Sequence, residues 1–196
     1  MWLAIIAYAV YNYAFYLFGA LLNVFFPIYV LAFVMAVVAL IRALLQVDVA
    51  AVARSFHPAT PVRAIGGALT GIGIGLAAVW IVMWAAHVFA GRPTPVDPEA
   101  FKVVAALDLA LMVPALTAGG ILLWRRRPLG YVIASLASIQ GALYLLVLSV
   151  NSMIAIRRGL ATAPGELPVW GTLLVITTVI ALVLLANVQR DRVTWR

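Results

Sequence analysis

The sequence predicts an all-α membrane protein whose single domain, residues 1–196, forms a bundle of six transmembrane helices. Of its residues, 66% are hydrophobic and only 10% are charged, whereas soluble domains have about 45–50% apolar and about 25% charged residues. The mean hydropathy is +1.14. The apolar residues lie in continuous runs without the alternation of barrel strands, and several runs reach the roughly 20 residues that a helix needs to cross a bilayer.

Turn residues divide the apolar runs into spans. As one helix the first 46 residues would be about 69 Å long, more than twice the hydrocarbon thickness, and Gly19, Asn23 and Pro27 mark the place where they fold back. Asp97 and Pro98 are an N-cap and a first helical residue for the fourth span. We therefore expect spans over about residues 2–19, 26–46, 64–90, 100–124, 130–153 and 168–188.

A short amphipathic segment separates the second and third spans. Over residues 48–56, Val49, Val52, Ala53 and Phe56 share one helical face, and Arg54 lies off it. This pattern predicts a short helix lying on the membrane surface.

The basic residues predict the topology. Four of them fall on one side of the six spans: Arg92, Lys102, Arg157 and Arg158. Nine fall on the side of the chain termini: Arg42, Arg54, Arg63, Arg125, Arg126, Arg127, Arg190, Arg192 and Arg196. By the positive-inside rule both termini are cytoplasmic, and a cleaved signal peptide is not expected because no basic n-region or cleavage motif accompanies the first apolar run.

Several classes of function are disfavoured. The net charge of +7 reflects basic residues at span ends, so it gives no indication of nucleic acid as a partner. The chain contains no cysteine, which removes thiol chemistry and cysteine-ligated metal sites. No nucleophile and base, metal-ligand set or phosphate loop occurs at recognisable spacing, so the sequence favours a non-enzyme and identifies no cofactor.

Asp108 is the acidic residue that lies within a span, in the stretch VAALDLALMVPAL. An intramembrane carboxylate costs about 2.5–3.5 kcal/mol on insertion scales unless it faces protein or water, and such residues are functional by default. Met112, Ala115 and Gly119 share its face, so Asp108 is expected to point into the bundle. Pro114 predicts a kink close by.

Polar stripes on other spans extend this hypothesis. They predict a polar pocket at middle to outer depth that opens towards the exterior, with Asp108 at its centre. The candidate ligand-binding or proton-coupling residues are Asp108, Asn12, Tyr16, His87, Gln140 and Tyr144.

Structural alternatives stay open for these residues. Polar side chains in spans commonly hydrogen-bond one helix to another, and His87, beside two tryptophans, fits an interfacial histidine. His87 could equally serve as the one axial ligand of a pigment or as the partner of Asp108 in a proton relay. The run Arg125, Arg126 and Arg127 fits either a topology signal or contact with lipid headgroups. The glycine-rich stretch GGALTGIGIG, residues 66–75, indicates close helix packing or flexibility.

Three stretches resemble a family of uncharacterised multi-pass bacterial membrane proteins. They are YNYAFYLFG at residues 11–19, LDL at 107–109 followed by Pro114, and LLWRRRPLGYV at 122–132. The resemblance covers the first span and the hairpin of the fourth and fifth spans. It implies a multi-pass protein of the bacterial cytoplasmic (inner) membrane whose relatives begin further upstream, and it brings no activity or residue roles with it.

Two functions remain. The first is binding or translocation of a small molecule or ion through the outward-facing pocket around Asp108. The second is a noncatalytic accessory subunit that packs against partner helices, lipids or pigments through the small-residue faces of the third and fourth spans. The expected partners are the lipid bilayer, a small-molecule or ion ligand, and other copies or subunits of a membrane complex.

Overall fold

Six helical segments of the protein are long and apolar enough to cross a membrane, which confirms the predicted fold class. The computed structural model describes residues 2–20, 22–94, 97–159 and 167–189. A π-helical turn, η1, joins two helices into the fourth segment. In chain order the elements are α1 (Trp2–Gly19), α2 (Phe26–Leu45), α3 (Val49–Ser55), α4 (Val62–Ala90), α5 (Pro98–Leu107), η1 (Asp108–Met112), α6 (Val113–Trp124), α7 (Pro128–Arg157) and α8 (Leu167–Ala186).

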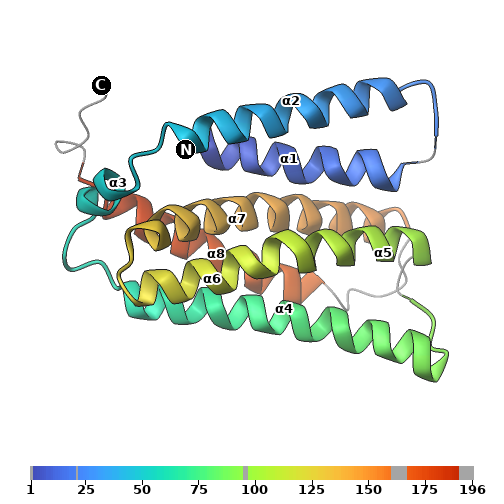
Figure 1. Ribbon diagram of the computed structural model, residues 1–196. Coiled ribbons are helices and arrows are strands. Elements are labelled where there is room, and N and C mark those ends of the chain that lie inside the picture. The colour runs from blue at the N-terminus through green and yellow to red at the C-terminus, as the bar shows by residue number, and fades with distance from the viewer. Residues whose placement is uncertain (1, 21, 95–96, 160–166, 190–196) are drawn as a thin grey trace.

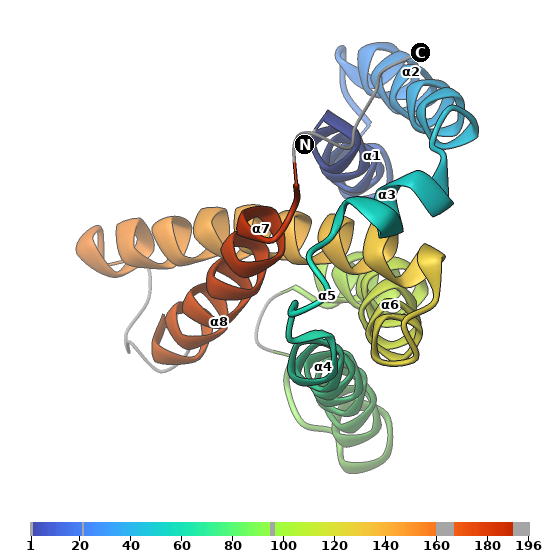
Figure 2. The same cartoon turned by 90° about the vertical axis from the view of Figure 1, so that its left-hand side faces the viewer.

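Helix α7 lies at the centre of the bundle. It contacts α1, α3, α6 and α8. The hairpin of α1 and α2 lies on one side of it, and α4, which packs against α6, lies on the other (Figure 1). Viewed from the end of the bundle, α7 and α8 tilt away from the direction shared by α1, α2, α4 and α6 (Figure 2).

The start of α1 and the end of α8 lie at the same end of the bundle, the end at which α3 lies (Figure 1). Six of the nine basic residues assigned to this end lie where they were predicted, on α2, α3 and α4 and around the α6–α7 turn. The other three, Arg190, Arg192 and Arg196, lie outside the described residues. That this end faces the cytoplasm stays a prediction.

Local signals in the sequence position the helix ends. The Asp97 carboxylate accepts a hydrogen bond from the Glu99 N–H at 3.0 Å and caps α5 as predicted. Asn23 accepts one from the Phe25 N–H at 2.8 Å in the turn before α2. Helix α7 continues to Arg157, four residues beyond the predicted end at 153, because residues 154–156 are apolar and contain no helix breaker.

The short helix predicted over residues 48–56 is present as α3, and its apolar side packs on protein. Val52 and Ala53 contact the hydrophobic core, and the rings of Phe56 and Tyr131 on α7 are 4.9 Å apart. The Gln189 N–H donates a hydrogen bond of 2.7 Å to the Ser55 carbonyl. The end of α3 is therefore joined to the end of α8.

Glycines bring α4 and α6 into close contact. A Cβ atom at Gly66 would lie 2.6 Å from the carbonyl oxygen of Gly120, and one at Gly73 would lie 2.7 Å from Cγ2 of Thr117. The close packing predicted for the glycine-rich stretch is thus confirmed. These glycines are thus used in contacts within the chain, and contact of the small-residue faces with partner subunits stays a prediction.

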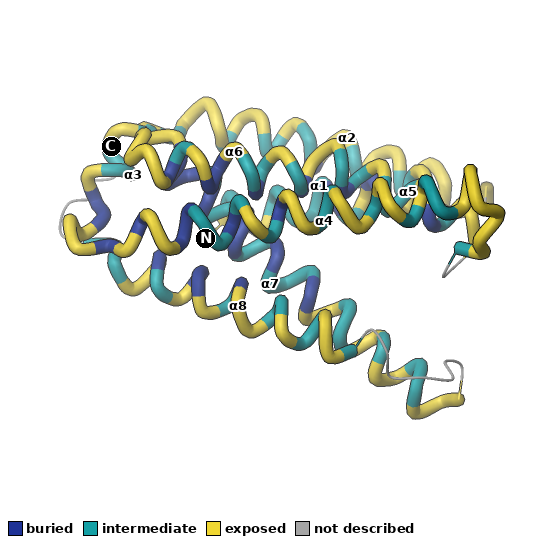
Figure 3. Tube along the Cα trace, turned by 90° about the horizontal axis from the view of Figure 1, so that it is seen from below, coloured by how far each residue is buried: buried dark blue, intermediate teal, exposed yellow. Residues whose placement is uncertain are grey.

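Buried residues gather where the helices face one another, and the outward sides are exposed (Figure 3). Many of the exposed residues are large and apolar, among them Leu31, Val82 and Leu182, each at least 60% exposed. Such a surface suits lipid rather than water. On α2 the only buried residue is Ala36, so this helix turns most of its surface away from the protein.

Candidate functional site

Asp108 lies in the interior of the bundle, as predicted, with only 3% of its surface exposed. It is the first residue of the π-turn η1, whose wide ring closes when the Val113 N–H donates to the Asp108 carbonyl. Pro114, two residues after this turn, has no N–H to donate to the Ala110 carbonyl. The distortion predicted at this proline therefore takes the form of a π-turn, a feature that is frequent at functional sites.

Three helices meet at the Asp108 carboxylate. The Tyr11 hydroxyl on α1 donates a hydrogen bond of 2.6 Å to Oδ1. The indole Nε1–H of Trp80 on α4 donates one of 3.0 Å to Oδ2. Both oxygens are thus held by neutral donors, each from a different helix.

Each of these donors belongs to an aromatic pair. The Tyr11 ring lies edge to face with Tyr144 of α7, with centroids 5.4 Å apart. The Trp80 ring lies edge to face with Phe101 of α5, with centroids 5.2 Å apart. We call the carboxylate and these four rings the Asp108 cluster, which is formed by Asp108, Tyr11, Trp80, Phe101 and Tyr144.

The cluster lies near the middle of the bundle. Asp108 is about 15 Å along the helix from the start of α5 and about 24 Å from the end of α6, at 1.5 Å per residue. Phe101 lies two turns from Asp108, towards the start of α5, and is buried. Phe101 and its partner Trp80 therefore form the part of the cluster nearer the end that the topology predicts to be exterior.

No cationic side chain of the described residues is bonded to the carboxylate. Among the described residues the one ion pair joins Lys102 to Glu99 at the exposed start of α5. The same part of the chain holds no group of three or more His, Cys, Asp or Glu residues that suits a metal ion. The negative charge of an ionised Asp108 is therefore uncompensated within the described protein.

Two of the predicted partners of Asp108 lie in or beside the cluster. Tyr144 belongs to it through its contact with Tyr11. Gln140, one turn away on α7, donates a hydrogen bond of 3.3 Å from Nε2 to Sδ of Met112, on the turn that carries Asp108. Both residues are half-buried.

The structure does not bring the other three predicted residues to the cluster. The Asn12 amide donates to the Tyr8 carbonyl on its own helix at 3.1 Å. The Tyr16 ring is 49% exposed and stacks on Tyr29 of α2, with centroids 5.9 Å apart. His87 is exposed, and its Nδ1 lies 2.8 Å from the carbonyl oxygen of Arg92, so it makes no direct relay with Asp108.

Sequence reasoning did not select Tyr11, Trp80 or Phe101 as site residues. For Tyr11 a usable signal existed, because Ala4 and Ala14 share its helical face and small residues mark faces that pack closely. Ala4, Tyr11 and Ala14 are each at most 3% exposed.

The arginine run closes the turn between α6 and α7. All three arginines are exposed, and Arg126 has a positive φ of 54°. The Arg127 N–H donates to the Leu122 carbonyl at 2.9 Å, which ends the helix. Contact of Arg125, Arg126 and Arg127 with lipid headgroups stays a prediction.

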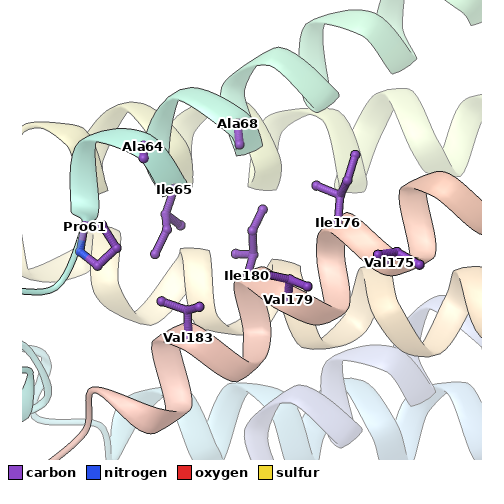
Figure 4. Close-up of a pocket in the computed structure, with 9 residues that line it drawn as sticks. All are labelled: Pro61, Ala64, Ile65, Ala68, Val175, Ile176, Val179, Ile180 and Val183. Atoms are coloured by element: carbon purple, nitrogen blue, oxygen red, sulfur yellow. The ribbon is translucent and has the colours of Figure 1, made fainter.

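A separate groove lies between α4 and α8 (Figure 4). Its volume is about 340 Å³. Side chains from the first turns of α4 and the second half of α8 line it, and every one is apolar: Pro61, Ala64, Ile65, Ala68, Val175, Ile176, Val179, Ile180 and Val183. None of these residues belongs to the Asp108 cluster.

Comparison with protein-family models, with curated proteins and with solved structures finds no match.

Proposed function

We propose that the protein is a membrane carrier that binds a small solute or ion at Asp108 and moves it across the bilayer. The observation that carries this proposal is a buried carboxylate whose hydrogen-bond donors, among the described residues, are neutral groups on α1 and α4. A buried carboxylate that only stabilises the fold is usually paired with a cation, because burial of an unpaired charge is costly. Membrane proteins keep such residues mainly along substrate, ion and proton pathways.

The hydrogen bonds of the cluster can be replaced by contacts with a solute or a proton. Tyr11 and Trp80 satisfy the carboxylate from neighbouring helices, and each bond breaks if its helix shifts relative to α5 and α6. A solute or proton that binds Asp108 takes over part of this role. The helices can then rearrange without leaving a charge unsatisfied in the bilayer.

The π-turn gives the Asp108 helix a place to bend. Pro114 removes one intrahelical hydrogen bond next to the carboxylate, and the ladder there already runs from residue i to i+5. Helices bend most readily where the regular ladder is interrupted. We propose that α5 moves relative to α6 at this turn, uncovering the cluster alternately towards either end.

The natural absence of cysteine allows a direct test. In the Asp108→Cys variant, reconstituted in vesicles, a carrier exposes the thiol to a membrane-impermeant methanethiosulfonate reagent from either side of the bilayer. We expect labelling from both sides, measured by mass spectrometry. Labelling from one side only contradicts translocation, and labelling from neither side contradicts the proposal altogether.

Three control variants make the labelling interpretable. Arg126→Cys and Glu99→Cys, at opposite exposed ends of the bundle, report the orientation of the protein in the vesicles and the activity of the reagent. Val79→Cys, on an apolar outward side of α4 and 52% exposed, reports reaction from within lipid. A signal at position 108 counts only where it exceeds the signal at position 79.

An accessory subunit of a membrane complex is the second candidate function. The observation that favours it is the apolar groove between α4 and α8, which can accept an apolar side chain or lipid tail of a partner. This candidate predicts that mild detergent extracts the chain within a larger particle, seen as added subunits in a native mass spectrum. A stable monomer or homo-oligomer without other polypeptides contradicts it.

A further inference from the structure

We infer that the solute of the Asp108 cluster is a monovalent organic cation of the alkylammonium class. The inference rests on the proposed carrier function and names the chemistry of its substrate. It follows from the charge of the cluster, from its aromatic content and from the small number of oxygen ligands in it.

The charge of the cluster selects a positive solute. Its one ionisable acid is Asp108, and no cationic side chain among the described residues is hydrogen-bonded to it. A buried carboxylate needs a partner of opposite charge or a proton. An anionic solute would add a second uncompensated negative charge at the same place.

The aromatic rings select an organic cation. Tyr11 and Tyr144 form one edge-to-face pair at Oδ1, and Trp80 and Phe101 form another at Oδ2. The faces of aromatic rings attract cations, and groups of such rings recognise substituted ammonium ions. The alkyl groups of such an ion also gain from contact with ring carbon atoms.

The oxygen content of the cluster disfavours a hard metal cation. Ca²⁺ takes about six to eight oxygen ligands and Mg²⁺ needs an octahedral shell. Besides the carboxylate of Asp108, the cluster offers only the hydroxyl groups of Tyr11 and Tyr144. An ammonium ion needs no such shell, because one carboxylate and several ring faces satisfy it.

Trp80 contributes both a hydrogen bond to the carboxylate and an aromatic ring to the cluster. Its indole N–H occupies Oδ2, and it is half-buried whereas Asp108 is buried. When a cation binds at Oδ2 in place of the indole N–H, the Trp80 ring can turn its face to the cation. Trp80 is therefore a specificity-determining residue for the organic cation.

Carbodiimide labelling tests this inference on the full chain in vesicles. Dicyclohexylcarbodiimide enters the bilayer and modifies protonated carboxyl groups there. Asp108 is the buried acidic residue of its span, whereas Glu99 lies at the exposed start of that span and is paired with Lys102. We expect tetrapropylammonium to slow the labelling of Asp108 about tenfold at about ten times its dissociation constant, by mass action. Sodium at the same concentration leaves the rate unchanged.

Tryptophan variants separate recognition from nonspecific effects. Trp80→Leu is expected to raise the protective concentration of tetrapropylammonium about tenfold, and Trp80→Phe, which keeps a ring, to raise it less. Trp84→Leu is the matched control, because Trp84 lies one turn away, is 52% exposed and contacts Phe89 rather than the cluster. Equal effects at positions 80 and 84 overturn the role of Trp80.

The outcomes distinguish the substrate class from the carrier function. No protection by tetrapropylammonium, or equal protection by sodium, overturns the organic cation. If the thiol at position 108 is then still reached from both sides of the bilayer, the carrier proposal stands with another solute. If that thiol is reached from neither side, the carrier proposal falls as well.

Discussion

Replacing Asp108 with asparagine is expected to abolish uptake of tetrapropylammonium into vesicles whose interior is acidic, while the protein stays folded. The amide has almost the same shape as the carboxylate but carries no charge, so it neither attracts the cation nor exchanges it for a proton. The measurement is accumulation of radiolabelled tetrapropylammonium in vesicles with equal amounts of wild-type or Asp108→Asn protein.

The stability of the Asp108→Asn protein decides how its uptake is interpreted. The amide keeps one acceptor oxygen but turns an N–H₂ group towards one of the two donors, which costs about 1–3 kcal/mol for a lost buried hydrogen bond. Removing a buried charge offsets this cost. If the unfolding temperature and the yield fall in parallel with uptake, Asp108 is structural.

Asp97→Asn is the matched control for this substitution. Asp97 caps α5, and asparagine caps helices about as well as aspartate. We expect normal uptake and normal stability in this variant. Loss of uptake in both variants would show that the effect at position 108 does not arise from the cluster.

Gly66→Ala is expected to destabilise the protein by about 1–3 kcal/mol, the usual cost of overpacking. The new Cβ would lie 2.6 Å from the carbonyl oxygen of Gly120 and 2.9 Å from the backbone nitrogen of Trp124. Backbone atoms cannot move aside as a side chain does, so α4 and α6 must separate. Thermal unfolding in detergent, followed by circular dichroism, measures the change.

Gly71→Ala on the same helix isolates the effect of packing. A Cβ at Gly71 meets nothing within 4 Å, and alanine favours a helix interior by about 1 kcal/mol over glycine. This variant is therefore expected to be as stable as the wild type or slightly more stable. Equal losses at positions 66 and 71 would contradict the close contact of α4 with α6.

The spans could be predicted from the sequence because the bilayer limits the length of an apolar run. The turn at Asn23 and the cap at Asp97 are short-range features and were located to within a few residues. The extension of α7 to Arg157 was not predicted. Residues 154–156 are apolar and contain no helix breaker, so no local signal ends the helix at residue 153.

The site was only partly predictable. Asp108 was identified because a carboxylate within a span is costly wherever it lies. Its partners depend on which helices are neighbours, and the contacts of α5 with α1 and of Asp108 with Trp80 on α4 join segments far apart in the chain. Sequence periodicity gives the faces of one helix but not the helix that each face meets.

The first helix illustrates the difficulty. Its most polar stripe, with Asn12 and Tyr16, was expected to face the site. Instead, Asn12 bonds its own backbone and Tyr16 stacks against α2. The buried face carries Tyr11 between small residues. Within the bilayer, close packing by small residues outweighed polarity in deciding which side of α1 faces inward.

The most direct test of the carrier account uses a thiol beside an intact Asp108. In Tyr144→Cys, the labelling rate with an impermeant reagent is measured from each side of the vesicle membrane, with and without tetrapropylammonium on one side. The account predicts reaction from both sides, slowed on both when the cation is added to either. A thiol that reacts from neither side, in vesicles where Arg126→Cys and Glu99→Cys react normally, would contradict it.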